Sequence, residues 1–184
     1  MRKMIYLSAL LLLFVLPIMA QQPLFPTPAK VQNGKGSFTI GKNLQIQGNG
    51  GYADKLAAGL QTELKEAGMQ SSPASGTIRL ELNNDCKMAD EAYTLVIEPN
   101  SILLQASSEA GLFYAKEALL QLSRFGKGSV RACKIQDQPR YGWRGFMLDE
   151  SRHFFGKEKV KQYLDIMASL RLNVFHWHLT DEPG

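Results

Sequence analysis

Cysteine is scarce in this sequence, with only Cys86 and Cys133 among its 184 residues. Their separation matches no zinc-ligand spacing, so the cysteines give no sign of a structural zinc module. Two alternatives stay open for the pair. A disulfide would close a long loop and stabilise the fold by about 4 kcal/mol through chain entropy, whereas two buried thiols would pack as small apolar side chains.

The sequence also lacks any stretch in which lysine and arginine are concentrated, although its formal net charge is +4. A nucleic-acid-binding surface would require such a basic patch, so no nucleic-acid partner is expected. Internal repeats and low-complexity tracts are absent as well. What remains is the ordinary mixture of apolar and charged residues found in globular domains.

The longest apolar run, residues 5–15, is too short for a membrane span, which needs about 20 apolar residues. It follows Arg2 and Lys3 and leads through Ala20 into polar sequence, which is the layout of a secretory signal peptide. We therefore predict a signal peptide at residues 1–20, export to the periplasm or the cell exterior, and no stable membrane span after cleavage. An uncleaved membrane anchor is the alternative. Cleavage would lower the formal net charge to +2.

Short strands and two helices are expected between residues 21 and 138. Leu56, Leu60 and Leu64 recur at every fourth position and predict a helix over 53–67. A serine, Ser107 or Ser108, would cap a second helix that ends near residue 122. Strands are expected at 38–40, 44–47, 77–82, 93–97, 102–104 and 129–134, with the fourth and fifth forming a hairpin. This pattern predicts an α+β domain over residues 21–138, with the helices packed on one face of a sheet.

The segment after Pro139 follows a different pattern, and we place a domain boundary at 136–139. A strand is expected over 143–149, a helix over 158–170 and a second strand over 172–179, which together make one βαβ unit with parallel strands. The apolar stripe of the helix consists of Val160, Leu164, Met167 and Leu170. Because one βαβ unit cannot cover both faces of its strands, residues 139–184 are expected to be a fragment of a larger domain.

Polar side chains follow both strands of this unit, where enzymes with parallel sheets place functional groups. Residues 149–153 follow the first strand, and His176, His178 and Asp181 lie at the end of the second. Parallel neighbours bring both groups to one rim. His176 and His178 point to the same face of their strand, and such an H-x-H pair suits a divalent metal as an alternative to hydrogen-bonded packing.

Two stretches of this unit carry a family resemblance. Residues 144–155, RGFMLDESRHFF, and 172–181, LNVFHWHLTD, resemble in order and spacing the opening of the barrel in family-twenty glycoside hydrolases, the β-N-acetylhexosaminidases. Residues 110–115 and 119–122 are similar to the accessory domain of that family. The resemblance implies an α+β accessory domain followed by an incomplete (β/α)8 TIM barrel, of which only the first βαβ unit is present.

The resemblance implies an exo-acting enzyme that removes terminal N-acetylglucosamine or N-acetylgalactosamine from glycans without a cofactor or metal. Such enzymes retain the anomeric configuration and use the acetamido oxygen of the substrate as nucleophile. Arg152 matches the substrate-binding arginine, and Asp181 matches an aspartate that supports the catalytic acid through a polar network. The catalytic Asp-Glu pair lies further along the chain in relatives and is not Asp181-Glu182. The 184 residues alone are therefore expected to be inactive.

Other interpretations of the same residues stay open. Arg152 could form an ion pair with Asp149 or Glu150, and Asp181 could cap a helix. His153 is expected to have a structural role, and Trp177 is expected to pack between strand and helix. At the level of function, the alternatives are a non-catalytic glycan- or protein-binding α+β module and a metal-dependent barrel hydrolase with an H-x-H site.

Overall fold

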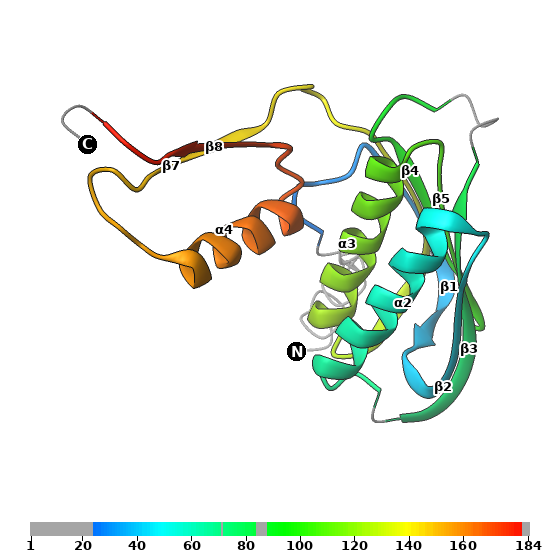
Figure 1. Cartoon of the computed structure of the whole chain (residues 1–184). Helices are drawn as coiled ribbons and strands as arrows, with labels where there is room; N and C mark the ends of the chain where they lie inside the picture. The colour runs from blue at the N-terminus through cyan, green and yellow to red at the C-terminus, as the bar shows by residue number, and fades with distance from the viewer. Residues whose placement is uncertain (1–23, 71, 84–87, 182–184) are drawn as a thin grey trace, which may run out of the picture.

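The computed structural model describes residues 24–70, 72–83 and 88–181. These residues form a six-stranded sheet with two helices, followed by a two-stranded sheet with one helix. Figure 1 shows how these elements are arranged. In chain order the elements are β1 (Lys30–Thr39), β2 (Gly41–Gly48), α2 (Gly51–Glu66), β3 (Ser72–Leu82), β4 (Tyr93–Ile97), β5 (Ser101–Ala106), α3 (Glu109–Phe125), β6 (Ser129–Asp137), β7 (Gly145–Asp149), α4 (Lys157–Ser169) and β8 (Val174–His178).

The six-stranded sheet is mixed, with the strand order β1-β6-β4-β5-β3-β2. The predicted hairpin is confirmed, because β4 and β5 are antiparallel neighbours that pair Tyr93 with Ala106. The strand β3 runs parallel to both of its neighbours, β2 and β5. Parallel neighbours require a crossover, and α2 supplies the crossover from β2 to β3.

The helices α2 and α3 lie side by side on one face of this sheet (Figure 1), as the sequence predicted. Ser108 is the N-cap of α3, and its side-chain oxygen accepts a hydrogen bond of 3.0 Å from the backbone N–H of Gly111. Of the predicted apolar stripe of α2, Leu60 and Leu64 are fully buried, whereas Leu56 is only partly buried. The cap and the apolar periodicity therefore identify both helices.

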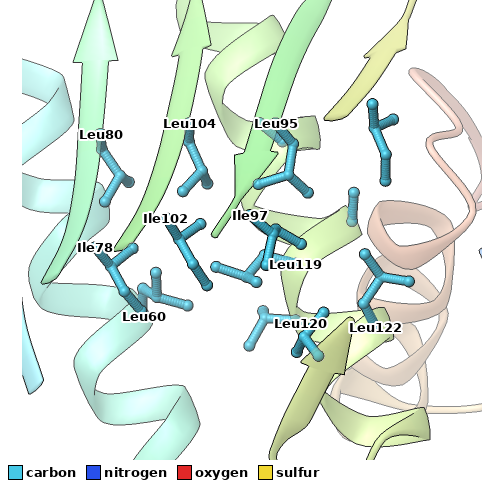
Figure 2. Packing of buried hydrophobic residues seen from close by; sticks show 14 of the residues in the cluster. Leu60, Ile78, Leu80, Leu95, Ile97, Ile102, Leu104, Leu119, Leu120 and Leu122 are labelled. Atoms are coloured by element: carbon cyan, nitrogen blue, oxygen red, sulfur yellow. The ribbon is translucent and has the colours of Figure 1, made fainter. Parts of the chain in front are cut away.

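The core of the first unit lies between the sheet and the two helices (Figure 2). Alternate residues of β4 and β5 are buried, which is the period of two expected for strands with one covered face. The fully buried side chains that meet there include Leu60, Ile78, Leu80, Leu95, Ile97, Ile102, Leu104 and Leu119. This layer gives the unit a hydrophobic core of its own.

Two strands are longer than predicted. The prediction began the first strand at residue 38, but β1 begins at Lys30, which pairs with Gln136 on β6. Similarly, β3 begins at Ser72, which pairs with Gly41 on β2. These added residues are mostly polar and lie outside the buried layer. Their extended conformation comes from hydrogen bonding to a neighbouring strand, and hydrophobic alternation therefore does not predict it.

The second unit is the predicted βαβ arrangement, with β7 and β8 parallel and α4 between them. The first strand is shorter than predicted, because β7 begins at Gly145. Trp143, which precedes the strand, is exposed. The predicted stripe of α4 is wrong at Leu164, which is exposed. Tyr163 contacts the sheet instead, with its ring centroid 5.3 Å from that of Phe146.

Several predictions concern residues outside the described part of the chain. The signal peptide at residues 1–20 and the side chain of Cys86 belong to this group. Export therefore stays a prediction, and the disulfide stays one of the two alternatives for the cysteine pair. Cys133 is buried on β6. Among the described helices, none combines the length and the apolar character that are needed to cross a bilayer.

Candidate active site at the carboxyl ends of β7 and β8

Arg152 and Asp181 meet at the rim where β7 and β8 end. The strands are in register, with Asp149 opposite His178, and the N–H of Glu150 extends the ladder with a 2.9 Å hydrogen bond to the His178 carbonyl. The guanidinium of Arg152 then reaches Asp181, with Nη2 2.9 Å and Nε 3.3 Å from Oδ2. The prediction that parallel strands bring these two side chains together is confirmed.

This ion pair is open to solvent, since the side chain of Arg152 is 76% exposed and that of Asp181 is 42% exposed. Exposed ion pairs contribute at most about 1 kcal/mol to stability. A guanidinium carries five N–H donors in a planar fork, so the contact with one carboxylate oxygen leaves donors for the hydroxyls of a ligand. The arrangement therefore suits binding better than it suits stabilising the fold.

Asp149 fixes the backbone that carries Arg152. Its Oδ1 accepts hydrogen bonds from the N–H of Arg152 at 3.0 Å and from the N–H of Ser151 at 3.1 Å. The bond from Arg152 is the main reason that the pKa of Asp149 lies below its ordinary value, with Ser151 and the charge of His178 contributing. The alternative that the Arg152 side chain pairs with Asp149 or Glu150 is wrong, because that side chain turns to Asp181.

Sequence reasoning missed the role of Glu150. Its side chain lies under the loop after β7, where the residue is only 7% exposed. The carboxylate accepts hydrogen bonds from the N–H groups of Phe155 and Gly156, at 3.1 and 3.0 Å, and from Nε1 of Trp177 at 2.6 Å. It therefore ties the loop and the start of α4 to β8. A glutamate between a strand and a helix start was the available signal, because helix N-termini favour carboxylates.

The predicted roles of the aromatic residues are only partly right. Trp177 is half-exposed on β8 and acts as a hydrogen-bond donor to Glu150, although its ring also lies 6.1 Å from that of Phe175. The ring of His153 packs edge-on against Phe155 with centroids 4.7 Å apart, in keeping with a structural role.

His176 and His178 lie on one face of β8, with ring centroids 6.3 Å apart. Among the described residues, no group of three or more histidine, cysteine, aspartate or glutamate side chains is placed to hold a metal ion. Glu182 lies outside those residues. Within residues 24–70, 72–83 and 88–181, the H-x-H pair therefore has no third protein ligand for a metal ion.

A cavity of about 570 Å³ lies elsewhere, at the junction of the two units. Its walls include Tyr93, Tyr114 and Asp137 from the first unit and Arg144 and Arg171 from the second. Neither Arg152 nor Asp181, which we call the rim pair, lines this cavity. The predicted site thus lies at the carboxyl ends of β7 and β8 and is separate from this cavity.

Comparison with known sequences identifies two matching regions. Residues 21–138 match glycosyl hydrolase family 20, domain 2, and residues 141–184 match the glycosyl hydrolase family 20 catalytic domain. The catalytic-domain match contains β7, α4 and β8, and with them the rim pair.

Individual relatives agree with this match. A β-hexosaminidase from Vibrio furnissii is 34% identical over 163 residues, which cover 88% of this chain and 27% of the relative. One from Porphyromonas gingivalis is 35% identical over 72% of this chain and 18% of its own length. The chain thus spans about a quarter or less of the length of these curated relatives.

Solved structures show the same arrangement of elements. An exo β-N-acetylglucosaminidase from Vibrio harveyi, crystallised with N-acetylglucosamine, superposes with a TM-score of 0.76 at 34% identity, covering 89% of this chain and 26% of its own. A β-N-acetylhexosaminidase from Streptomyces coelicolor gives 0.77 at 31% identity, covering 89% and 36%. Because the matches extend over both units of the fold, the chain belongs to glycoside hydrolase family 20.

Proposed function

We propose that the protein carrying this chain is an exo-acting β-N-acetylhexosaminidase that removes terminal N-acetylglucosamine or N-acetylgalactosamine from glycans. The observation that carries the proposal is the pair formed by Arg152 and Asp181 at 2.9 Å, on the rim where barrel enzymes bind their substrates. A solved structure with a similar fold, with a TM-score of 0.76, is that of an exo β-N-acetylglucosaminidase in complex with N-acetylglucosamine.

In this proposal Arg152 binds the terminal sugar. Its planar fork donates hydrogen bonds to neighbouring hydroxyls, and Asp181 orients the fork through the contacts to Nε and Nη2. Asp149 supports this position of Arg152 as well, because it accepts a hydrogen bond from the backbone N–H of Arg152. Asp181 also supports the catalytic acid through a polar network, as the family resemblance implies.

The reaction is substrate-assisted hydrolysis. The acetamido oxygen bonds to the anomeric carbon while the glycosidic bond breaks and the leaving oxygen takes a proton from a carboxylic acid. Water then adds to the anomeric carbon as that carbon's bond to the acetamido oxygen breaks, and the carboxylate takes a proton from the water. The acetamide and the carboxylic acid are thereby restored, and the configuration is retained. The family resemblance assigns acid and acetamide orientation to an adjacent Asp-Glu pair and gives Asp181 a supporting role only.

Enzyme assays of the full gene product test this function. The purified protein should release nitrophenol from 4-nitrophenyl β-glycosides of both N-acetylhexosamines. Arg152→Ala should lower kcat/KM by about 10- to 100-fold, since it removes charged hydrogen bonds to the substrate. Arg124→Ala, an exposed arginine on α3, is the matched control and should leave kcat/KM unchanged. Failure to release either sugar would refute the assignment.

Export belongs to the proposal as well. The layout of residues 1–20 supports a cleaved signal peptide, which places the enzyme in the periplasm or outside the cell. N-terminal sequencing of the protein secreted by its own host should begin near Gln21. A mature protein that still carries Met1 would contradict cleavage.

A further inference from the structure

The carboxylate of Glu91 bridges the two units of the fold. It binds the guanidinium of Arg144 in two places, with Oε2 2.9 Å from Nη1 and Oε1 3.0 Å from Nη2. Its Oε1 also accepts a hydrogen bond of 3.1 Å from Nδ2 of Asn173. Arg144 precedes β7 and Asn173 precedes β8. One carboxylate of the first unit therefore holds the amino ends of both strands that carry the rim pair.

Arg144 and Asn173 are also bound to each other. The N–H of Arg144 donates to Oδ1 of Asn173 at 2.9 Å, and the N–H of Asn173 donates to the Arg144 carbonyl at 2.9 Å. With Glu91 they form a closed set of hydrogen bonds that aligns the two strand starts. The side chains of Arg144 and Glu91 are only 15% and 14% exposed, so solvent screens this pair less than the rim pair.

The first unit holds Glu91 in a defined position. Its backbone is left-handed, with φ at +64°, which a non-glycine residue keeps only when its surroundings enforce it. The N–H of Ala92 closes a turn on the carbonyl of Ala89 at 3.0 Å. Gly111 on α3 lets the carbonyl of Ala92 approach so closely that a Cβ at Gly111 would lie 2.3 Å from it. The start of α3 thus supports the loop that presents the carboxylate.

The strand register links Glu91 to the opposite rim. Five residue pairs, from Gly145–Val174 to Asp149–His178, connect the amino ends of the two strands to the rim pair at their carboxyl ends. A slip of one residue would shift one strand by about 3.3 Å and turn its side chains to the other face. An isolated pair of strands is only marginally stable in water, so contacts outside the described two-stranded sheet contribute to its register.

We propose that Glu91 is a positioning residue, which fixes the register of β7 and β8 and thereby the alignment of Arg152 with Asp181. The inference rests on the proposed function only in calling this rim a substrate site. The proposal gives the first unit a defined role in substrate binding, because the side chain of Glu91 lies in that unit and aligns two binding groups of the second unit.

Hydrogen exchange in the full gene product, followed by NMR, tests the proposal. Two protons report on the far rim: the indole Nε1–H of Trp177, bound to Glu150, and the N–H of Glu150, bound to His178. Glu91→Ala should speed their exchange by about ten-fold or more, while amides of β4 and β5 change less than about two-fold. Glu91→Gln retains an acceptor oxygen and should recover part of the protection.

Glu63→Ala is the matched control. It removes a 2.7 Å ion pair to Lys116 within the first unit and leaves β7 and β8 untouched, so both reporter protons should keep their rates. Equal effects of Glu91→Ala and Glu63→Ala at the rim, or equal acceleration throughout the chain, would overturn the proposal. Because no activity is measured, an inactive gene product would refute the proposed function without affecting this test.

Discussion

Arg171 and Asp137 form an ion pair across the junction of the two units, with Nη1 3.1 Å from Oδ2. Their side chains are only 9% and 10% exposed. Nη1 of Arg171 also donates to the Pro26 carbonyl at 3.1 Å, whereas Nε and Nη2 have no hydrogen-bond partner among the described residues. A buried cation that is only partly satisfied depends strongly on its one carboxylate partner.

Asp137→Asn should therefore lower the free energy of unfolding by about 3–5 kcal/mol, because it leaves the Arg171 charge buried and unpaired. Urea denaturation followed by circular dichroism measures the change. Asp165→Asn makes the same chemical change at an exposed position on α4 and should shift stability by less than about 0.5 kcal/mol. If the two variants were equally stable, the ion pair would contribute nothing. Adding Arg171→Met to Asp137→Asn should restore part of the loss, since it removes the unpaired charge.

Glu150→Ala should loosen the loop between β7 and α4. The change leaves three N–H donors without their acceptor, which costs about 1–3 kcal/mol for a buried group. The exchange of the Phe155 and Gly156 amides should accelerate, and the emission of Trp177 should shift to longer wavelength. Glu158→Ala, at an exposed position of α4, should change neither. Unchanged amide exchange in Glu150→Ala would show that the carboxylate does not hold the loop.

The turn at Asp149 should respond to acid. Its pKa in the folded protein lies below the ordinary 3.8, mainly because of the hydrogen bond from the Arg152 N–H. The stabilisation is therefore complete above pH 3.8 and is lost as the pH falls through the lower folded value. NMR titration should show the Arg152 amide shift moving with a midpoint below 3.8. In Asp149→Asn this transition should disappear, and a midpoint at or above 3.8 would contradict the hydrogen-bond geometry.

Two glycines of the first unit should respond oppositely to alanine. At Gly111 a Cβ would meet the Ala92 carbonyl at 2.3 Å, so Gly111→Ala should destabilise the chain by about 1–3 kcal/mol. At Gly59, within α2, the nearest atom would be 3.9 Å away, so Gly59→Ala should stabilise the chain by about 0.5–1 kcal/mol. Thermal denaturation of both variants measures the two changes in stability. A neutral Gly111→Ala would mean that the contact beneath Glu91 is not tight.

Local sequence patterns determined the helices and the order of the elements. The leucine period identified α2. A serine cap identified the start of α3, and the structure selected Ser108 over Ser107 as that cap. The strand, helix and strand after Pro139 required β7 and β8 to be parallel, which already placed Arg152 and Asp181 at one rim. These features depend on residues that are close in sequence or on a general rule of connection, so a single sequence contains the information.

Tertiary structure alone decided which charged groups pair. Arg152 had three carboxylates within reach by sequence reasoning, and the direction of its side chain selected Asp181. Glu91 and Arg144 are 53 residues apart, and nothing in their local sequence indicates that they meet. The length of β1 likewise depends on its partner β6. Periodicity specifies the face on which a residue lies, whereas the packing of distant segments specifies what that face meets.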